Sequence, residues 1–160
     1  MAYFVVTGAS SGIGEAMCEV LAREGHSLIL VARRQSLLET LKERLEKYAG
    51  CQVVVMPMDL SNPDEVCRLY EACLAYDVIG LVNNAGYGLY GEFLELDISD
   101  EFNMIDLNIK SVHYLSKLFL RRFVAQDRGY LLNVASTAAF QSGPLMASYY
   151  ASKGYVLQLT

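Results

Sequence analysis

The sequence predicts a doubly wound α/β fold, in which helices cover both faces of a parallel sheet. Short runs rich in Val, Ile and Leu alternate with longer segments whose apolar residues recur every three or four positions. A glycine-rich loop follows the first apolar run directly. No repeat, linker or low-complexity tract divides the 160 residues, so we expect one domain over residues 1–160.

Five strands are expected, because five runs are short, rich in β-branched residues and bounded by turn residues. They are Tyr3 to Thr7, Ser27 to Ala32, Gln52 to Met56, Ile79 to Asn83 and Tyr130 to Val134. Continuous apolar runs are typical of strands that are buried on both faces of a parallel sheet. The helical segments between them would provide the crossover connections.

The first three helices are indicated by apolar residues that step by three or four. These residues are Met17, Val20 and Leu21 in the first, Leu38, Leu41, Leu45 and Tyr48 in the second, and Val66, Leu69, Tyr70 and Cys73 in the third. The third helix has a readable start. Asn62 can cap it, Pro63 fits its first turn, and Glu65 stands where a capping box needs an acid.

A fourth helix is expected to begin near Ser99 and to run to about residue 125. Its broad apolar face consists of Phe102, Ile105, Ile109, Val112, Leu115, Phe119 and Phe123. This face can pack inside the chain or against a second copy, so we expect either core packing or a homodimer through the 99–125 helix. A last helix would start around Met146.

The composition favours a globular protein that acts on small molecules. The chain is 53% hydrophobic and 19% charged with a formal net charge of -5, which argues against a nucleic-acid binder with a basic face. The cysteines Cys18, Cys51, Cys67 and Cys73 form no C-x-x-C pair, so we interpret them as small buried apolar residues. His26 and His113 stand far apart, so no metal site is expected. We find no signal peptide and no membrane span, and we expect a cytoplasmic protein.

A glycine loop, Thr7-Gly8-Ala9-Ser10-Ser11-Gly12-Ile13-Gly14, lies between the first strand and the first helix. Glycines let the backbone approach a pyrophosphate, whose charge is stabilised by the free N–H groups and dipole of the following helix. The spacing G-x-x-x-G-x-G is a variant of the Rossmann dinucleotide fingerprint. A P-loop is excluded because no Gly-Lys-Ser/Thr follows. We therefore expect dinucleotide contacts from Gly8, Ser10, Ser11, Gly12, Ile13 and Gly14.

The end of the second strand predicts which dinucleotide is bound. An acid there would bind the ribose 2′-hydroxyl of NAD, whereas an arginine accommodates the 2′-phosphate of NADP. The strand ends in Ala32-Arg33-Arg34 and carries no acid, so we predict that NADP(H) is preferred over NAD(H). The alternative for Arg33 and Arg34 is a solvated basic helix start. Asp59, with Leu60 beside it, can accept from the adenine amino group or can serve as a turn residue.

Several motifs together resemble the short-chain dehydrogenase/reductase family across the whole chain. Besides the glycine loop they are Asn83-Asn84-Ala85-Gly86 after the fourth strand, Asn108 in the long helix, Ser136 after the fifth strand, and Tyr149-x-x-x-Lys153. The resemblance implies an oxidoreductase that uses NADP(H) on a small-molecule carbonyl or alcohol. It also implies that Asn84, Ala85 and Gly86 lie along the cofactor.

The resemblance further implies the catalytic roles. Tyr149 would be the general acid or base, Ser136 would hold the reacting oxygen, Lys153 would bind the nicotinamide ribose, and Asn108 would position a water. The spacing from Ser136 selects Tyr149 over its neighbour Tyr150. Independently, residues four apart share a helix face, and a nearby ammonium favours the phenolate.

The resemblance also implies that this chain lacks the last strands of the family's sheet, because the family continues beyond the Tyr-Lys helix. We then expect the fifth strand to have an unpaired edge. The alternative to an active enzyme is therefore a truncated, catalytically inactive dinucleotide-binding fragment.

Overall fold

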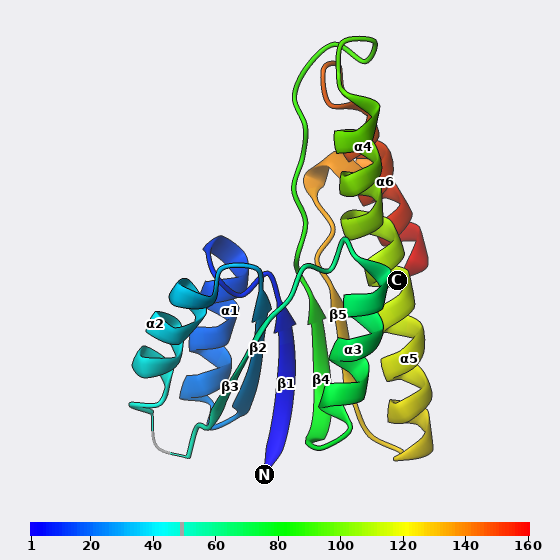
Figure 1. The fold of residues 1–160 in the computed structure, drawn as a ribbon. Helices are drawn as coiled ribbons and strands as arrows, with labels where there is room; N and C mark the ends of the chain where they lie inside the picture. The colour runs from blue at the N-terminus through cyan, green and yellow to red at the C-terminus, as the bar shows by residue number, and fades with distance from the viewer. Residues whose placement is uncertain (49) are drawn as a thin grey trace.

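A five-stranded parallel sheet forms the centre of the protein, as a computed structural model shows for residues 1–48 and 50–160 (Figure 1). The strands lie in the order β3-β2-β1-β4-β5, and every described pairing is parallel. Their bounds are β1 Ala2–Thr7, β2 Ser27–Ala32, β3 Val53–Pro57, β4 Asp77–Asn83 and β5 Tyr130–Asn133. The chain progresses to one side of β1 first and then to the other, which creates a crevice at the carboxyl ends of the strands.

Helices cover both faces of the sheet, which confirms the predicted fold class. Helices α1 (Gly12–Arg23) and α2 (Gln35–Leu45) lie on one face, and α3 (Pro63–Cys73) and α5 (Val112–Ala125) lie on the other (Figure 1). The side chains of β1 alternate between two cores. Val5 packs in the cluster that contains Leu69 and Phe119, whereas Val6 packs in the cluster that contains Cys18 and Leu38.

The predicted strand bounds were wrong by one or two residues at five strand ends. β1 begins at Ala2, β3 begins at Val53 and ends at Pro57, β4 begins at Asp77, and β5 ends at Asn133. These ends depend on which backbone groups find a partner in the neighbouring strand, and the apolar pattern does not report that.

The start of α3 confirms two of the three predicted capping features. Asn62 Oδ1 accepts from the Asp64 N–H at 3.0 Å, and Pro63 occupies the first turn. The capping box was wrong, because the Glu65 carboxylate accepts from the N–H of Asp59 and not from that of Asn62. The Asn62 N–H donates instead to the Asp59 carbonyl at 3.0 Å.

The long helix runs as predicted but changes its winding in the middle. It consists of α4 (Ile98–Ile105), a π-helical segment η1 (Asp106–Ser111) and α5, and Asp97 caps its start. The predicted apolar face packs mainly inside the chain, where Leu115, Phe119 and Phe123 join the core, while Phe102 is 58% exposed. π-Helical turns occur frequently at functional sites.

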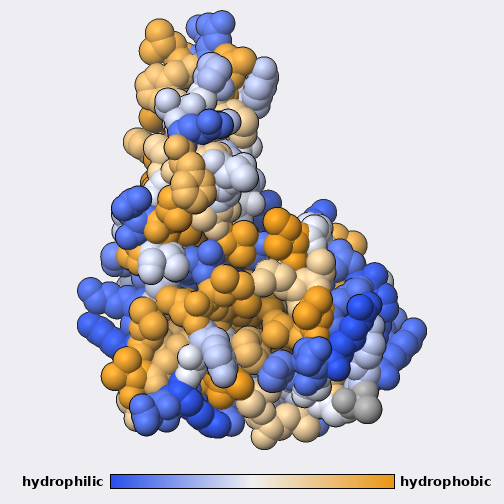
Figure 2. Space-filling model, turned by 180° about the vertical axis from the view of Figure 1, so that it is seen from behind, coloured by the Kyte–Doolittle hydropathy of each residue, from blue (hydrophilic) through white to orange (hydrophobic). Residues whose placement is uncertain are grey.

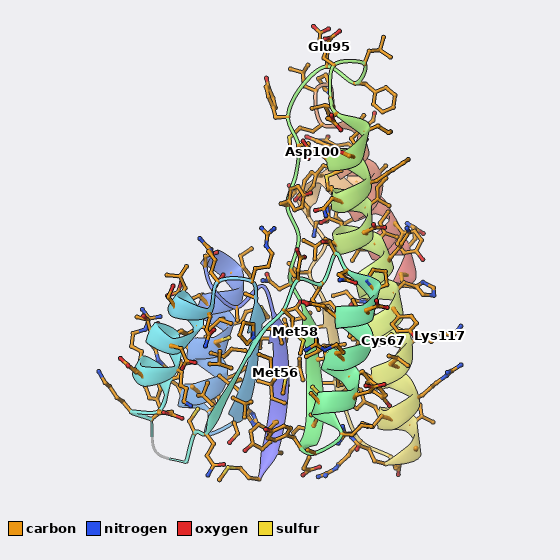
Figure 3. The ribbon with its side chains drawn as sticks, in the orientation of Figure 1. Met56, Met58, Cys67, Glu95, Asp100 and Lys117 are labelled. Atoms are coloured by element: carbon orange, nitrogen blue, oxygen red, sulfur yellow. The ribbon has the colours of Figure 1, made fainter. Side chains whose placement is uncertain are left out.

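An arm projects above the sheet (Figure 1). It consists of the 84–97 loop, α4, the 3₁₀ segment η2 (Thr137–Phe140) and α6 (Ala147–Leu159), which begins where the sequence predicts the last helix. Figure 3 shows Glu95 near the tip of the arm and Asp100 on α4 below it. The Gly91 N–H donates to the Leu145 carbonyl at 2.8 Å, which joins the loop to the segment before α6.

An apolar surface lies on the α1 side of the sheet, over β4 and β5 (Figure 2). Its exposed side chains are Ile13 and Val20 of α1 and Tyr130 and Leu132 of β5. Within the described ranges, β5 pairs only with β4 and forms an edge of the sheet, as expected from the sequence.

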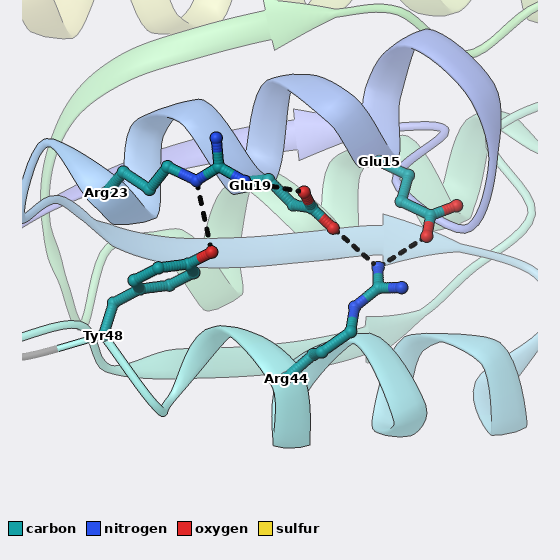
Figure 4. Close-up of polar contacts among 5 residues, drawn as sticks. All are labelled: Glu15, Glu19, Arg23, Arg44 and Tyr48. Atoms are coloured by element: carbon teal, nitrogen blue, oxygen red, sulfur yellow. Dashed lines mark hydrogen bonds and ion pairs between the residues drawn. The ribbon is translucent and has the colours of Figure 1, made fainter.

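Polar contacts join α1 to the chain around α2 (Figure 4). Arg44 bridges Glu15 at 2.5 Å and Glu19 at 3.1 Å, and Arg23 donates to the Tyr48 hydroxyl at 3.2 Å. All of these groups are partly solvated, so each pair contributes at most about 1 kcal/mol.

The cysteines are not all buried. Cys18, Cys51 and Cys73 are buried, but Cys67 is half-buried and contacts the Tyr114 hydroxyl at 3.5 Å, so its interpretation as a core residue was wrong. Burial raises the pKa of Cys18 and of Cys73 to about 12. In the described part of the chain we find no cluster of metal-binding side chains and no helix long and apolar enough to cross a membrane.

Candidate functional site

A cavity of about 380 Å³ lies at the carboxyl ends of the strands. The loops after all five strands and helix α6 contribute to its wall. The predicted site residues that line it are Gly8, Ser10, Ser11, Ile13, Arg33, Arg34, Asp59, Leu60, Asn84, Ala85, Gly86, Tyr149 and Lys153. Gly12, Gly14, Asn108 and Ser136 are not among the lining residues.

The three loop glycines are required for different reasons. Gly8 has φ +66°, and a Cβ there would lie 2.8 Å from Ala85 Cα. Gly12 has φ +59° but open space around it, so only its backbone conformation favours glycine. A Cβ on Gly14 would lie 2.4 Å from the Gly8 carbonyl oxygen. The loop is therefore packed so closely that only glycine fits at Gly8 and Gly14.

The start of α1 contributes Ser11 and Ile13 to the cavity wall. Ser11 is the N-cap residue, but its side chain makes no capping hydrogen bond. The first N–H groups of a helix need an external acceptor, and the positive end of the helix dipole favours an anion. The start of α1 is therefore suited to a phosphate group.

Asn84 ties the end of β4 to the glycine loop. Its Nδ2 donates to the Thr7 carbonyl at 3.0 Å and to the Gly8 carbonyl at 3.2 Å. The Thr7 hydroxyl oxygen in turn accepts from the N–H groups of Asn84 and Ala85, both at 3.0 Å. Asn84 therefore lines the cavity and also holds the loop in place, a role that sequence reasoning missed.

Two arginines give one end of the cavity a positive charge. Arg34 donates to the Ser10 and Ser11 hydroxyls at 3.2 and 3.3 Å, and Arg33 lies in the cavity wall beside it. Arg34 is thus engaged with the glycine loop and is not only a solvated helix start. A guanidinium next to hydroxyl groups suits a phosphate ligand.

Asp59 has the turn role that the sequence left open. Its Oδ1 accepts from the Ser61 N–H at 3.0 Å and from the Ser61 hydroxyl at 2.8 Å. Asp59 and the buried Leu60 also line the cavity. An adenine contact from Asp59 stays a prediction.

Asn108 lies in the π-helical segment and is fully buried. Its Oδ1 accepts from the Tyr87 N–H at 3.1 Å, and its Nδ2 donates to the Tyr87 carbonyl at 2.8 Å and to the Ser152 hydroxyl at 3.0 Å. The Ser152 hydroxyl donates onward to the Tyr149 carbonyl at 2.7 Å. Asn108 therefore joins the loop after β4 to helix α6, and its water-positioning role stays a prediction.

Tyr149 and Lys153 project from α6 into the cavity wall. Lys153 is 6% exposed, and its Nζ donates to the Val134 carbonyl at 2.9 Å. Burial lowers the pKa of Lys153, because the protein interior disfavours the ammonium. Tyr150 lies outside the cavity, where its ring packs against Gly143.

Ser136, like Asn108, is a predicted catalytic residue that is not among the residues of the cavity wall. Its hydroxyl oxygen accepts from the Ala138 N–H at 3.1 Å and caps η2. A hydroxyl that accepts still has its own proton to donate. The contact of Ser136 with a substrate oxygen stays a prediction.

Tyr87 and Ser152 are site residues that sequence reasoning missed. Tyr87 follows directly on Asn83-Asn84-Ala85-Gly86, and Ser152 precedes Lys153, so their positions next to motif residues were the only signal. Burial raises the pKa of Tyr87, and the nearby Asp100 carboxylate adds to the shift.

The chain is similar to known proteins in sequence and in fold. A family model described as short chain dehydrogenase matches residues 2–160. The very-long-chain 3-oxoacyl-CoA reductase-B of Danio rerio is 34% identical over 156 residues, which are 95% of this chain and 50% of that protein. A short-chain dehydrogenase from Sphingobium yanoikuyae in complex with NADPH superposes with a TM-score of 0.94 at 32% identity, covering 99% of this chain and 63% of that one.

The cofactors named for the similar structures differ. An NAD+-bound xylitol dehydrogenase superposes with a TM-score of 0.89 at 26% identity, covering 99% of this chain and 62% of that one. The chain thus spans about half to two thirds of the lengths of these proteins.

Proposed function

The chain belongs to the short-chain dehydrogenase family, and from this membership we propose that it forms the cofactor-binding and proton-transfer part of an NADP(H)-dependent oxidoreductase. The reaction is hydride transfer between a nicotinamide and a carbonyl or alcohol. The single observation that carries the proposal is the cavity. It has the glycine loop and two arginines along one part of its wall and Tyr149 and Lys153 along another.

The residues present fit a dinucleotide. Gly8 lies in the cavity wall, Gly12 has open space where a Cβ would stand, and the uncapped start of α1 offers N–H donors to a pyrophosphate. The residues that would hold it are the glycine loop, Asp59 with Leu60, the 84–86 segment and Lys153.

The preference for NADP(H) rests on the end of β2. Arg33 and Arg34 stand where an acid would bind a free ribose hydroxyl, and Arg34 already contacts two loop hydroxyls. The similar structures name both NADPH and NAD+, so the family alone does not decide the preference. The two arginines favour NADP(H), because a 2′-phosphate pairs well with guanidinium groups.

Proton transfer is assigned to Tyr149. When bound, NADPH supplies the hydride. The Tyr149 hydroxyl gives its proton to the carbonyl oxygen, and the Lys153 ammonium stabilises the phenolate that remains. The Ser136 hydroxyl donates a hydrogen bond to the same oxygen and keeps its proton. In the reverse direction the phenolate accepts the alcohol proton.

The substrate is proposed to be a carbonyl or alcohol with apolar substituents. Gly88 lies against Tyr149, since a Cβ there would be 3.1 Å from the ring and 2.8 Å from Met146 Cε. Exposed apolar side chains on the neighbouring loop, among them Tyr90 and Phe93, add apolar surface to the arm.

A second copy of the chain is proposed to pack on the exposed side of the 99–125 helix, where Tyr114 and Leu120 are each 44% exposed.

The cofactor assignment is tested by replacing Arg33 and Arg34 together with alanine. We expect the affinity for NADPH to fall about tenfold or more, because charge-assisted hydrogen bonds contribute about 1.5 to 3 kcal/mol each, and the affinity for NADH to stay within a factor of two. Titration followed by cofactor fluorescence measures both. Equal losses for the two cofactors would contradict the assignment.

The proton-transfer assignment is tested with Tyr149→Phe, which keeps the ring and removes the hydroxyl. We expect turnover to fall by about 10² or more while NADPH still binds, and Tyr150→Phe is the matched control. The alternative function is a dinucleotide-binding fragment without turnover. NADPH binding without oxidation by any aldehyde or ketone of a broad panel would favour that alternative.

A further inference from the structure

Tyr87 lies in the cavity wall and connects the π-helical segment with helix α4. Its backbone is held by Asn108, as described above, while its side chain extends to α4. The Tyr87 hydroxyl lies 2.9 Å from Asn103 Oδ1 and 3.3 Å from the Asp100 carbonyl. A tyrosine has one hydroxyl proton to donate, so we assign its hydrogen bond to Asn103 Oδ1, the nearer of the two acceptors.

From Asn103 the hydrogen bonds continue to the turn after β3. Asn103 Nδ2 donates to the Ser61 hydroxyl oxygen at 3.0 Å, and the Ser61 hydroxyl donates to Asp59 Oδ1 at 2.8 Å. The directions are consistent, since each group donates once to the next from Tyr87 to Asp59. Figure 3 shows the two regions that these hydrogen bonds join, with Met58 just before the turn after β3 and Asp100 on α4.

We propose that Tyr87 is a positioning residue that acts through Asn103 and Ser61 to orient the Asp59 carboxylate for the adenine end of the cofactor. The inference rests on the proposed function, because it assumes that a dinucleotide occupies the cavity. Asp59 Oδ1 is taken up by Ser61, which leaves Oδ2 to accept from a ligand. The relay therefore fixes the rotation of the carboxylate without occupying both of its oxygens.

Tyr87 is suited to this role by its two anchors. The backbone of Tyr87 is tied to the buried Asn108, which also holds Ser152 of the Tyr149 helix. The Tyr87 hydroxyl therefore starts from a fixed point, and a hydrogen-bonded chain with a fixed start loses less conformational freedom when the ligand binds. Tyr87 thereby connects the turn that contains Asp59 and Ser61 to α6, the helix that carries Tyr149.

The test uses adenosine 2′,5′-bisphosphate, which contains the adenine end of NADPH but no nicotinamide. Tyr87→Phe removes only the hydroxyl, and Tyr90→Phe is the matched control on the same loop, because Tyr90 is 74% exposed. Asn103→Ala breaks the chain at its second link and serves as an independent variant. Calorimetric titration gives the affinities for the bisphosphate and for NADPH, and thermal unfolding checks that each variant is folded.

We expect Tyr87→Phe and Asn103→Ala to weaken the bisphosphate and NADPH by the same factor, about two- to tenfold, which corresponds to one net hydrogen bond. Tyr90→Phe is expected to change neither. In a chain that carries Asp59→Asn, Tyr87→Phe is expected to cost nothing further, because the residue through which it acts is already altered.

Three results would overturn the inference. They are an unchanged affinity for the bisphosphate in Tyr87→Phe, a loss confined to NADPH, and an equal loss with and without Asp59→Asn. Failure of the unaltered chain to bind NADPH would instead refute the proposed function. It would also refute the inference, which requires a dinucleotide in the cavity.

Discussion

Gly14→Ala is the substitution whose outcome the structure determines most sharply. Gly14 lies in the first turn of α1, where alanine would normally stabilise a helix by about 1 kcal/mol. Here the new Cβ would lie 2.4 Å from the Gly8 carbonyl oxygen and 2.5 Å from Asn84 Nδ2. The local gain and the steric cost therefore oppose each other.

The steric cost is expected to win. Overpacking a close contact costs about 1 to 3 kcal/mol. Relief of the clash moves Asn84 away from the Thr7 and Gly8 carbonyls, and each hydrogen bond lost there costs about 0.5 to 1.5 kcal/mol. After the helix gain is subtracted, we expect Gly14→Ala to lower the free energy of unfolding by about 1 to 5 kcal/mol.

Urea denaturation measures the loss of stability, and NADPH titration measures the consequence for the cavity, where we expect at least about a tenfold weaker affinity because the loop backbone is displaced. Gly25→Ala is the matched control. Gly25 has φ +82° with nothing within 4 Å of a Cβ, so it should lose about 1 to 2 kcal/mol from backbone strain alone and keep its affinity. A Gly14→Ala protein as stable as the unaltered chain, with unchanged affinity, would refute the view that Gly8 and Asn84 are held rigidly.

Three further outcomes are expected. Arg44→Ala should lower the free energy of unfolding by less than about 1 kcal/mol, since its partners in Figure 4 are partly solvated; a larger loss in urea denaturation would show that the contact is structural. Iodoacetamide followed by mass mapping should modify Cys67 first and leave Cys18 intact, because Cys18 is fully buried and its pKa is about 12; equal labelling of the two in the native protein would contradict the burial. The pKa of Lys153 is lower in the folded protein than in the unfolded chain, where it is about 10.4. Between these two pKa values the unfolded chain binds one more proton than the folded protein. The free energy of unfolding of the unaltered chain, relative to that of Lys153→Met, should therefore rise with pH across this window. Denaturation at stepped pH tests this, and a difference that falls or stays constant would rule it out.

The sequence by itself determined the features that depend on local pattern. Strand and helix order follow from hydrophobic periodicity, and the Asn62 cap and the variant glycine loop follow from residue type at fixed spacing. The end of β2 likewise carries Arg33 and Arg34 in any fold that keeps the strand. These features depend only on neighbours along the chain, so the structure agrees with them.

Tertiary structure alone decided which polar atoms meet. Glu65 accepts from the Asp59 N–H and not from the cap residue of its own helix, and Asn84 holds the loop after β1. Tyr87, in the loop after β4, reaches Asn103 on α4. Such partners lie up to tens of residues apart, and each buried polar group takes whichever partner the fold brings within about 3 Å. Residue type limits what a side chain can donate or accept, but only the folded arrangement of the segments that carry these residues selects the partner.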